Sequence, residues 1–95
     1  MKIHIPTPLR AYTGGQEIVE VGAMSVQGAL DALTMSAPEL RKHLFTEDNK
    51  LRSFVNVYLN DDDIRYLPAK EATGTGPDDE LTIIPSIAGG SRAKL

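Results

Sequence analysis

The order of the periodic segments along the chain is the feature that most constrains its fold. Only one segment has the apolar spacing of a long helix, and it begins after Ser25, a good N-cap residue. Its apolar stripe, at positions i, i+3, i+4 and i+7, consists of Val26, Ala29, Leu30 and Leu33. The segments on either side alternate as β-strands do. One long helix can cover one face of a sheet, so we expect a single α+β domain.

The segment before this helix predicts an antiparallel hairpin. Residues 3–9 indicate a first strand, and Pro6 and Pro8 are expected to bend its far end, because proline has no N–H to donate to a sheet. A turn signal at residues 13–16 leads to a returning strand at residues 17–21. The chain is therefore expected to open with two strands of the sheet.

A second, short helix is expected at residues 36–44. Ser36 and Glu39 have the spacing of a capping box, in which each side chain satisfies a free backbone N–H group. The helix carries two apolar residues for the core, Leu40 and Leu44. Inside the first helix, Gly28 costs about 1 kcal/mol relative to alanine, so we expect it to allow close packing on the sheet.

The rest of the chain predicts three more strands. Residues 54–59 are the clearest of them, and after a turn at residues 60–63 we expect residues 64–67 to pair back antiparallel. A polar loop at residues 70–79 leads to the last strand at residues 81–84. The last strand is expected in the middle of the sheet, beside the first. We therefore predict a β-grasp (ubiquitin-like) fold, in which a mixed sheet packs against one main helix plus a short helix.

Composition excludes several functions. The chain has no cysteine, which excludes disulfides, thiolate metal sites and a cysteine nucleophile. A net charge of -3, with no Trp, two Phe and three Tyr, argues against a nucleic-acid-binding surface. No apolar run has the length of a signal peptide or a membrane span, so we expect a soluble cytoplasmic protein.

No cluster of residues predicts catalysis or metal binding by the chain itself. His4 and His43 are far apart in the sequence, and no second histidine lies at i+4 from either. The acidic run 61–63 lacks the spacing of a calcium-binding loop, so we expect a solvated turn. Gly14 and Gly15 are not followed by Lys and Ser or Thr, so they predict a turn rather than a phosphate-binding loop. We expect no metal and no permanently bound cofactor.

A pair of glycines, Gly89 and Gly90, follows the last strand and lies five residues before the end of the chain. Glycine has no Cβ atom, so it adopts backbone angles closed to other residues and can pass through a narrow tunnel. A strand that leads into such a segment can present it to the active site of another protein.

Along nearly its whole length the chain resembles the ubiquitin-like sulfur carriers of the MoaD/ThiS family. The strongest likeness is the final segment, in which the acidic run 78–80 is followed by residues 81–90. Four other segments resemble most the carriers that feed sulfur to cysteine synthesis; they are residues 9–10, 13–16, 52–61 and 63–65. Carriers for molybdopterin and thiamin synthesis share the same tail and are the alternative.

The resemblance implies a protein substrate and carrier rather than an enzyme. An adenylating enzyme would use ATP to activate the carboxylate of Gly90, and a sulfur donor would convert it to a thiocarboxylate. Gly89, Ala88, Ile87 and Pro85 would give the tail access to that enzyme. The resemblance also implies two further partners, a PLP-dependent cysteine synthase and a metalloprotease of the JAMM type.

The chain departs from the family pattern after the second glycine. Gly90 is joined to Ser91 by a peptide bond, and an amide carbonyl cannot attack ATP. We therefore expect a precursor that is cut between Gly90 and Ser91, with loss of residues 91–95. An appended tail, or a tail recruited for another role, is the alternative. We expect a β-grasp domain at residues 1–88 and a flexible tail at residues 89–95.

Phe54 and Tyr58 are candidates for a partner surface. They alternate with Val55, Val57 and Leu59, so one set faces the helix and the other faces outward, and the period alone does not say which. If the aliphatic set is inward, the two aromatic residues form an exposed patch suited to binding a protein.

Two alternatives stay open from the sequence. The acidic run 78–80 is either a solubilising loop or a docking site for basic residues of the activating enzyme. The chain as a whole is alternatively a ubiquitin-like modifier or interaction module whose tail forms isopeptide bonds to lysines. The product distinguishes the two functions, since one gives a thiocarboxylated protein and the other gives conjugates of higher mass.

Overall fold

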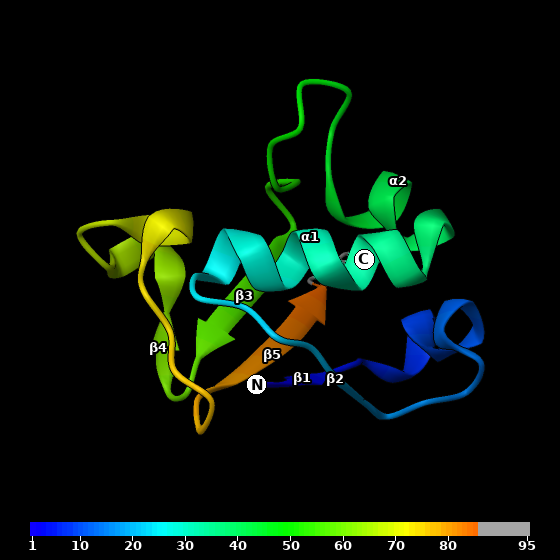
Figure 1. Ribbon diagram of the computed structural model, residues 1–95. Helices are drawn as coiled ribbons and strands as arrows, with labels where there is room; N and C mark the ends of the chain where they lie inside the picture. Colours follow the sequence, from blue (N-terminus) through cyan, green and yellow to red (C-terminus); the bar gives the residue numbers. More distant parts are fainter. Residues whose placement is uncertain (86–95) are drawn as a thin grey trace.

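The computed structural model describes residues 1–85, which form one mixed sheet with a helix across one face (Figure 1). The strands are β1 (Lys2–His4), β2 (Ile18–Glu20), β3 (Val55–Leu59), β4 (Asp62–Asp63) and β5 (Glu80–Pro85). Their order in the sheet is β2-β1-β5-β3-β4, with β1 and β5 parallel and the other pairs antiparallel. The β-grasp arrangement, with the last strand beside the first, is confirmed.

The main helix α1 (Val26–Ser36) and the short helix α2 (Arg41–Leu44) were both expected from the sequence. The inward faces of α1 and the sheet form the core, and most of its residues are at most 2% exposed. The largest contributors are Ile3, Leu30, Leu33, Val55, Val57, Leu81 and Ile83. Each buried aliphatic side chain of this size contributes about 1.5–3 kcal/mol, so this interface holds the sheet and the helix together.

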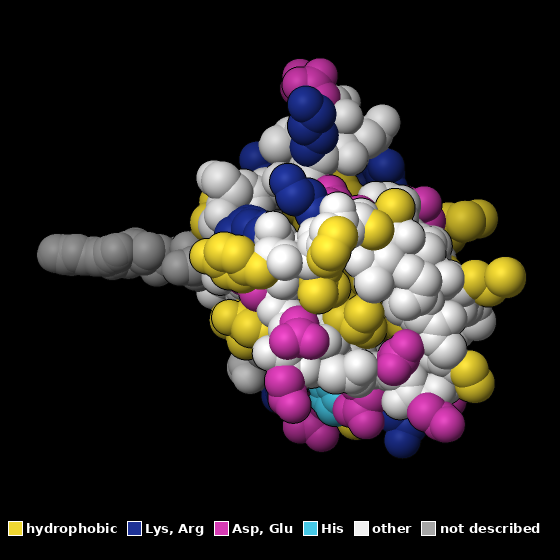
Figure 2. All heavy atoms as spheres, turned by 90° about the vertical axis from the view of Figure 1, so that its left-hand side faces the viewer, with side chains coloured by type: hydrophobic (Ala, Val, Ile, Leu, Met, Phe, Trp, Pro, Cys, Tyr) yellow, Lys and Arg dark blue, Asp and Glu magenta, His cyan; other side chains and the backbone are white. Residues whose placement is uncertain are grey.

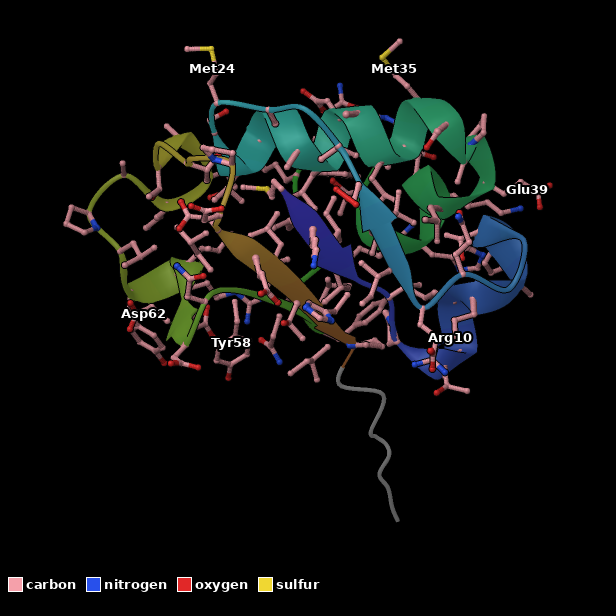
Figure 3. All side chains as sticks on the ribbon, turned by 60° about the horizontal axis from the view of Figure 1, so that its bottom comes forward. Arg10, Met24, Met35, Glu39, Tyr58 and Asp62 are labelled. Carbon is pink, nitrogen blue, oxygen red and sulfur yellow. The ribbon has the colours of Figure 1, made fainter. Side chains whose placement is uncertain are left out.

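The burial of residues along β3 shows which face of this strand points inward. Val55, Val57 and Leu59 are buried, and the residues between them face the other side of the sheet. Tyr58 is half-buried on that outer face, and Phe54, just before the strand, is exposed. Figure 3 shows Tyr58 on the side of the sheet away from α1.

The first strand is shorter than expected. It ends at His4, although Ile5 still donates a backbone hydrogen bond to Glu17 of the returning strand, at 2.8 Å. Residues Thr7–Thr13 form a 3-10 helix, η1, instead of the end of a strand. Pro8 lies in the first turn of η1, where a missing N–H does no harm, and Gly14 ends it in the left-handed region at φ 67°.

The expected strand at residues 64–67 is wrong. The residues that pair back on β3 are those of β4, and a 3-10 turn, η3 (Ile64–Tyr66), follows at once. The carboxylate of Asp63 accepts a hydrogen bond from the backbone N–H of Arg65 at 2.9 Å, which favours the turn over an extended strand. Ile64 is buried as part of this turn, so its apolar character reflects the core rather than a strand.

The expected capping box at Ser36 is also wrong. The Ser36 hydroxyl donates to the carbonyl of Leu33 at 3.0 Å, and the next helical segment is a 3-10 turn, η2 (Pro38–Leu40), without a side-chain cap. This turn leads directly into α2, so the expected helix is present but is started by proline. Its two leucines, Leu40 and Leu44, are buried as expected.

Gly28 has a different role from the one expected. Its N–H donates to the hydroxyl of Ser25 at 3.0 Å, which confirms Ser25 as the N-cap of α1. A Cβ atom at Gly28 would lie 3.2 Å from the same hydroxyl oxygen and 3.7 Å from Cβ of Ala23. The glycine therefore leaves room for the cap rather than for packing on the sheet.

The cap predicts the cost of removing the Ser25 hydroxyl. Ser25→Ala leaves the N–H of Gly28, in the first turn of α1, without its acceptor, and we expect it to lower the free energy of unfolding by about 1 kcal/mol. Ser36→Ala makes the same chemical change at the other end of α1 and should cost less than about 0.5 kcal/mol. Urea unfolding of both variants measures the difference, and equal costs would contradict the capping role.

Candidate functional site

The candidate site is the end of β5, where the described part of the chain leads toward the paired glycines. The predicted tail residues Ile87, Ala88, Gly89 and Gly90, and the predicted cleavage site before Ser91, lie outside the described residues. Pro85 is the last residue of β5 and the last described one, and it pairs in register with Val55 of β3. It has no N–H to donate, which suits the end of a hydrogen-bonded ladder.

Strand β5 is held on both sides. It pairs in parallel with β1 and antiparallel with β3, and it carries Leu81 and Ile83 into the core. Residues 81–82 are paired on both edges, whereas residues 83–85 are paired with β3 alone. The position of Pro85 is therefore set by its pairing with Val55 and by the burial of Ile83 two residues earlier.

Two hollows adjoin Pro85. The first, here called the sheet-face groove, has a volume of about 580 Å³ and is formed by the ends of β1 and β5 with the start of η1. Residues that line it include His4, Pro6, Arg10, Thr82 and Ile84. The second, here called the helix-side hollow, has a volume of about 300 Å³ and lies between η1, α2 and the start of β3. The residues at this exit therefore come from four separate parts of the chain.

Arg65 supports one wall of the exit. Its guanidinium group donates hydrogen bonds to the carbonyl oxygens of Val55 at 2.6 Å and Ser53 at 2.9 Å, and to Oδ1 of Asn56 at 2.7 Å. The rigid, planar fork of arginine can reach several acceptors at once. It fixes the segment that carries Phe54 into β3, directly beside Pro85.

These hydrogen bonds predict that replacing Arg65 lowers the stability of the fold by an amount that depends on the new side chain. Arg65→Ala removes all of them and should lower the free energy of unfolding by about 1–2 kcal/mol, whereas Arg65→Lys should recover only part of the loss. Amide exchange at Val55, whose N–H donates to the carbonyl of Arg52, should speed up in both variants. The control is Lys50→Ala, which removes an exposed charge that makes no such hydrogen bonds within residues 1–85. If Lys50→Ala lowers the free energy of unfolding as much as Arg65→Ala, the supporting role of Arg65 is refuted.

The outward residues near the exit are partly apolar. Phe54 is 44% exposed and Ile84 is 47% exposed, and Ile84 lies opposite Asn56 in the ladder between β3 and β5. Tyr58 lies opposite Thr82, one step further from the exit on the same face. Phe54 and Tyr58 are therefore both outside the core, as a partner surface requires, with Asn56 between them. Their role in binding stays a prediction.

The charges divide along the length of β5. Glu80 begins the strand, and a third, smaller hollow at that end is lined by four acidic residues, Glu20, Asp78, Asp79 and Glu80, together with Lys2. The Pro85 end is lined by cations instead, namely Arg10 in the groove and Lys42 and Arg52 in the helix-side hollow. In Figure 2 most acidic side chains lie in the lower half of the face and most Lys and Arg side chains in the upper half.

Two of the three acidic residues at positions 78–80 form structural hydrogen bonds. The carboxylate of Asp79 accepts from the N–H of Gly76 at 2.8 Å and from Nδ2 of Asn60 at 3.1 Å, and these bonds, the first most strongly, lower the pKa of Asp79. Oε1 of Glu80 lies 2.5 Å from Nε2 of His4, and this bond lowers the pKa of Glu80. The run lies roughly 17 Å along the strand from Pro85. Its docking role stays a prediction, and any such contact would be far from the tail exit.

The hydrogen bonds of Asp79 predict how stability depends on pH. Because the folded-state pKa is lower than the unfolded value near 3.8, Asp79 stabilises the fold above that pH, and the contribution is lost as the pH falls through the folded pKa. Asp79→Asn keeps an acceptor oxygen but does not titrate, so its stability should fall less than that of the wild type below pH 4. Urea unfolding across this range measures it, with Asp78→Asn as the control that should behave as the wild type.

His43 lies in the helix-side hollow, and the sequence assigned it no role. Its ring packs against Tyr12, with the ring centroids 4.6 Å apart, and its Nε2 atom is buried without a hydrogen-bond partner among residues 1–85. Within the same residues no three His, Asp or Glu side chains are grouped as metal ligands. None of the described helices has both the length and the apolarity needed to cross a membrane.

Comparison with known proteins identifies relatives along nearly the full chain. The model of the ThiS family matches residues 3–90. The sulfur carrier protein CysO of Mycobacterium tuberculosis is 34% identical over 90 residues, which cover 93% of this chain and 96% of that protein. The small archaeal modifier protein 1 of Haloferax volcanii is 35% identical over 83 residues, which cover 84% of this chain and 90% of that protein.

A solved structure gives the same result for the fold. A chain in the crystal structure of the Amycolatopsis orientalis BexX/CysO complex matches with a TM-score of 0.83 and 36% identity. The match covers 94% of this chain and 98% of that chain. The comparisons confirm the resemblance inferred from the sequence, and the solved relative was crystallised together with a protein partner.

Proposed function

The chain belongs to the ThiS family, and from that membership we propose that it is a sulfur carrier of the CysO type. One observation carries the proposal: the family match ends at residue 90, the second glycine. Gly90 is thus the residue that would carry sulfur, and Ser91 to Leu95 lie beyond the matched region. We propose the delivery of sulfur to cysteine or related amino-acid synthesis as the pathway.

The proposed chemistry takes place on the tail and uses no side chain of the domain. A carboxylate oxygen of Gly90 attacks the α-phosphorus of ATP, and pyrophosphate leaves. A sulfur donor then attacks the acyl carbon, AMP leaves, and a thiocarboxylate is formed. In the proposed pathway the thiocarboxylate sulfur attacks Cβ of an activated serine on a PLP-dependent synthase and displaces its leaving group, so the new cysteine stays joined to the Gly90 acyl carbon. Hydrolysis by a JAMM-type metalloprotease then frees the cysteine and restores the Gly90 carboxylate.

The position of Pro85 supports a carrier, because it places the last described residue at the end of the central strand β5. Pro85 is fixed by the central strand, and five further residues lead to Gly90. Five residues span at most about 18 Å, so the enzyme must bring its ATP within that distance of the domain surface. We therefore expect the partner to contact the surface around Pro85 while the tail reaches its active site.

The proposal requires a cut before activation. The Gly90 carbonyl is an amide in the chain as it stands, so the carboxylate that reacts must come from hydrolysis between Gly90 and Ser91. We propose that a JAMM-type metalloprotease makes this cut, which leaves a domain at residues 1–88 followed by the two glycines.

A second function is favoured by one of the relatives. The archaeal protein that is 35% identical to this chain is named as a modifier, and attachment to lysines would use the same activated glycine. Both functions need adenylation of Gly90, but they differ in the acceptor. Thiocarboxylate as the end product supports a carrier, whereas an isopeptide bond supports a modifier.

The activation step predicts a difference between two forms of the protein. The form that ends at Gly90 and the full chain of 95 residues are incubated with ATP, a sulfide donor and the adenylating enzyme of the source organism. Only the shorter form should exchange one oxygen for sulfur, as intact mass shows, and addition of the JAMM-type protease should make the full chain react. Gly90→Ala in the shorter form should slow the reaction, because a side chain is added where the enzyme closes around the tail.

A shorter form that is folded and stays unmodified would contradict the carrier proposal. Sulfur on the full chain without cleavage would contradict the requirement for a free Gly90 carboxylate.

A further inference from the structure

The helix-side hollow combines an apolar floor with a cationic rim. The buried residues Leu9 and Val55 form its floor, and the exposed residues Pro8 and Phe54 lie at its edge with Pro85. Its rim carries two cations, Lys42 and Arg52, and the ring of His43 lines it beside them. Among residues 1–85 no carboxylate lines this hollow. An occupant that suits it has an apolar part and carries negative charge.

The two permanent cations of the rim lack acidic partners. Among residues 1–85 the carboxylate pairs within 4.0 Å involve His4, Arg10 and Arg41, and neither Lys42 nor Arg52 takes part in one. Their positive charge is therefore left for a partner, although the described chain is rich in Asp and Glu elsewhere. The surface around the hollow is therefore positively charged, although the chain as a whole has a net charge of -3.

Arg52 is also ordered in advance. Its Nε donates a hydrogen bond to the carbonyl of Lys42 at 2.9 Å, which ties the segment before β3 to helix α2. A side chain that is already fixed loses less conformational entropy when it binds a partner. The terminal nitrogens of the guanidinium group stay available for a carboxylate, which they can bind in a bidentate geometry.

We propose that the helix-side hollow docks the adenylating enzyme, and that it receives an apolar side chain of that enzyme flanked by Asp or Glu carboxylates. The inference rests on the proposed function and adds the chemistry of the partner surface. The two cations without carboxylate partners in the described part of the chain, Lys42 and Arg52, and the position of Pro85 at the edge of the hollow carry it. An enzyme that draws in the tail has to cover this hollow, since its rim adjoins the point where the tail begins.

Other occupants fit less well. A phosphate group would meet the basic residues but leave the apolar lining uncovered, and five of the eight lining residues are apolar, namely Pro8, Leu9, Phe54, Val55 and Pro85. The hollow also adjoins Pro85, five residues before the glycine that reacts, so it is not the place where ATP meets the carboxylate. A protein surface with one protruding apolar side chain and carboxylates beside it matches both the apolar lining and the two cations of the hollow.

The test compares variants that lose the same charge at different places. Lys42→Gln with Arg52→Gln neutralises the rim, and Lys2→Gln with Lys70→Gln neutralises two cations that do not line the hollow. All variants end at Gly90, which keeps every core residue, and circular dichroism checks that they fold. The probe is the adenylating enzyme of the source organism, assayed by exchange of labelled pyrophosphate into ATP at several salt concentrations.

The rim variant should raise the KM for the carrier by about tenfold with little change in kcat, because the charges act in association and not in the chemistry. Its KM should also depend less on salt than that of the wild type. Lys42→Glu with Arg52→Glu should raise the KM further, and the control pair should stay within about twofold of the wild type.

The experiment distinguishes failure of the docking inference from failure of the proposed function. If the wild type ending at Gly90 supports exchange and the rim variants have an unchanged KM, the docking inference is overturned and the carrier function stands. If the control pair raises the KM as much as the rim pair, the effect is one of net charge and the inference is overturned as well. If the folded wild type supports no exchange at all, the proposed function fails and the docking inference fails with it.

Discussion

The structure depends on the pairing of the last strand with the first. Strand β5 joins β1 in parallel and β3 antiparallel, and its Leu81 and Ile83 complete the core beneath α1. Residues almost 80 positions apart in the chain are therefore neighbours at the centre of the sheet. Closing so long a loop costs conformational entropy, which burial of these side chains has to offset. The same pairing fixes Pro85, and with it the place from which the glycine segment starts.

Around that fixed point the domain presents two different surfaces. On the outer face of the sheet, Ile84 offers exposed apolar area in the sheet-face groove. On the other side, Lys42 and Arg52 surround the helix-side hollow. The acidic residues lie at the opposite end of β5, where Asp79 and Glu80 bond to their own domain. A partner that approaches the tail therefore meets apolar and cationic groups, and the carboxylates serve the fold.

The sequence predicted those features that depend on local periodicity and on rules of connection. The stripe from Val26 to Leu33 predicted α1, and the order of elements predicted a central last strand. The errors arose where side chains bond to nearby backbone, as Asp63 does in η3, or where Pro8 favours a 3-10 turn. The roles of Arg65 and the hollow could not be predicted, because their partners come from distant segments. The glycine motif predicted the tail, which lies outside the described residues.

The most direct test of the account is the intact mass of the protein isolated from its own cells without reducing or alkaline treatment, with fragmentation to locate any change. The account predicts a species that ends at Gly90 and carries sulfur in place of one oxygen of that terminal carboxylate. Recovery of the protein only as the full chain ending at Leu95, or only as conjugates joined to lysines of other proteins, would contradict it.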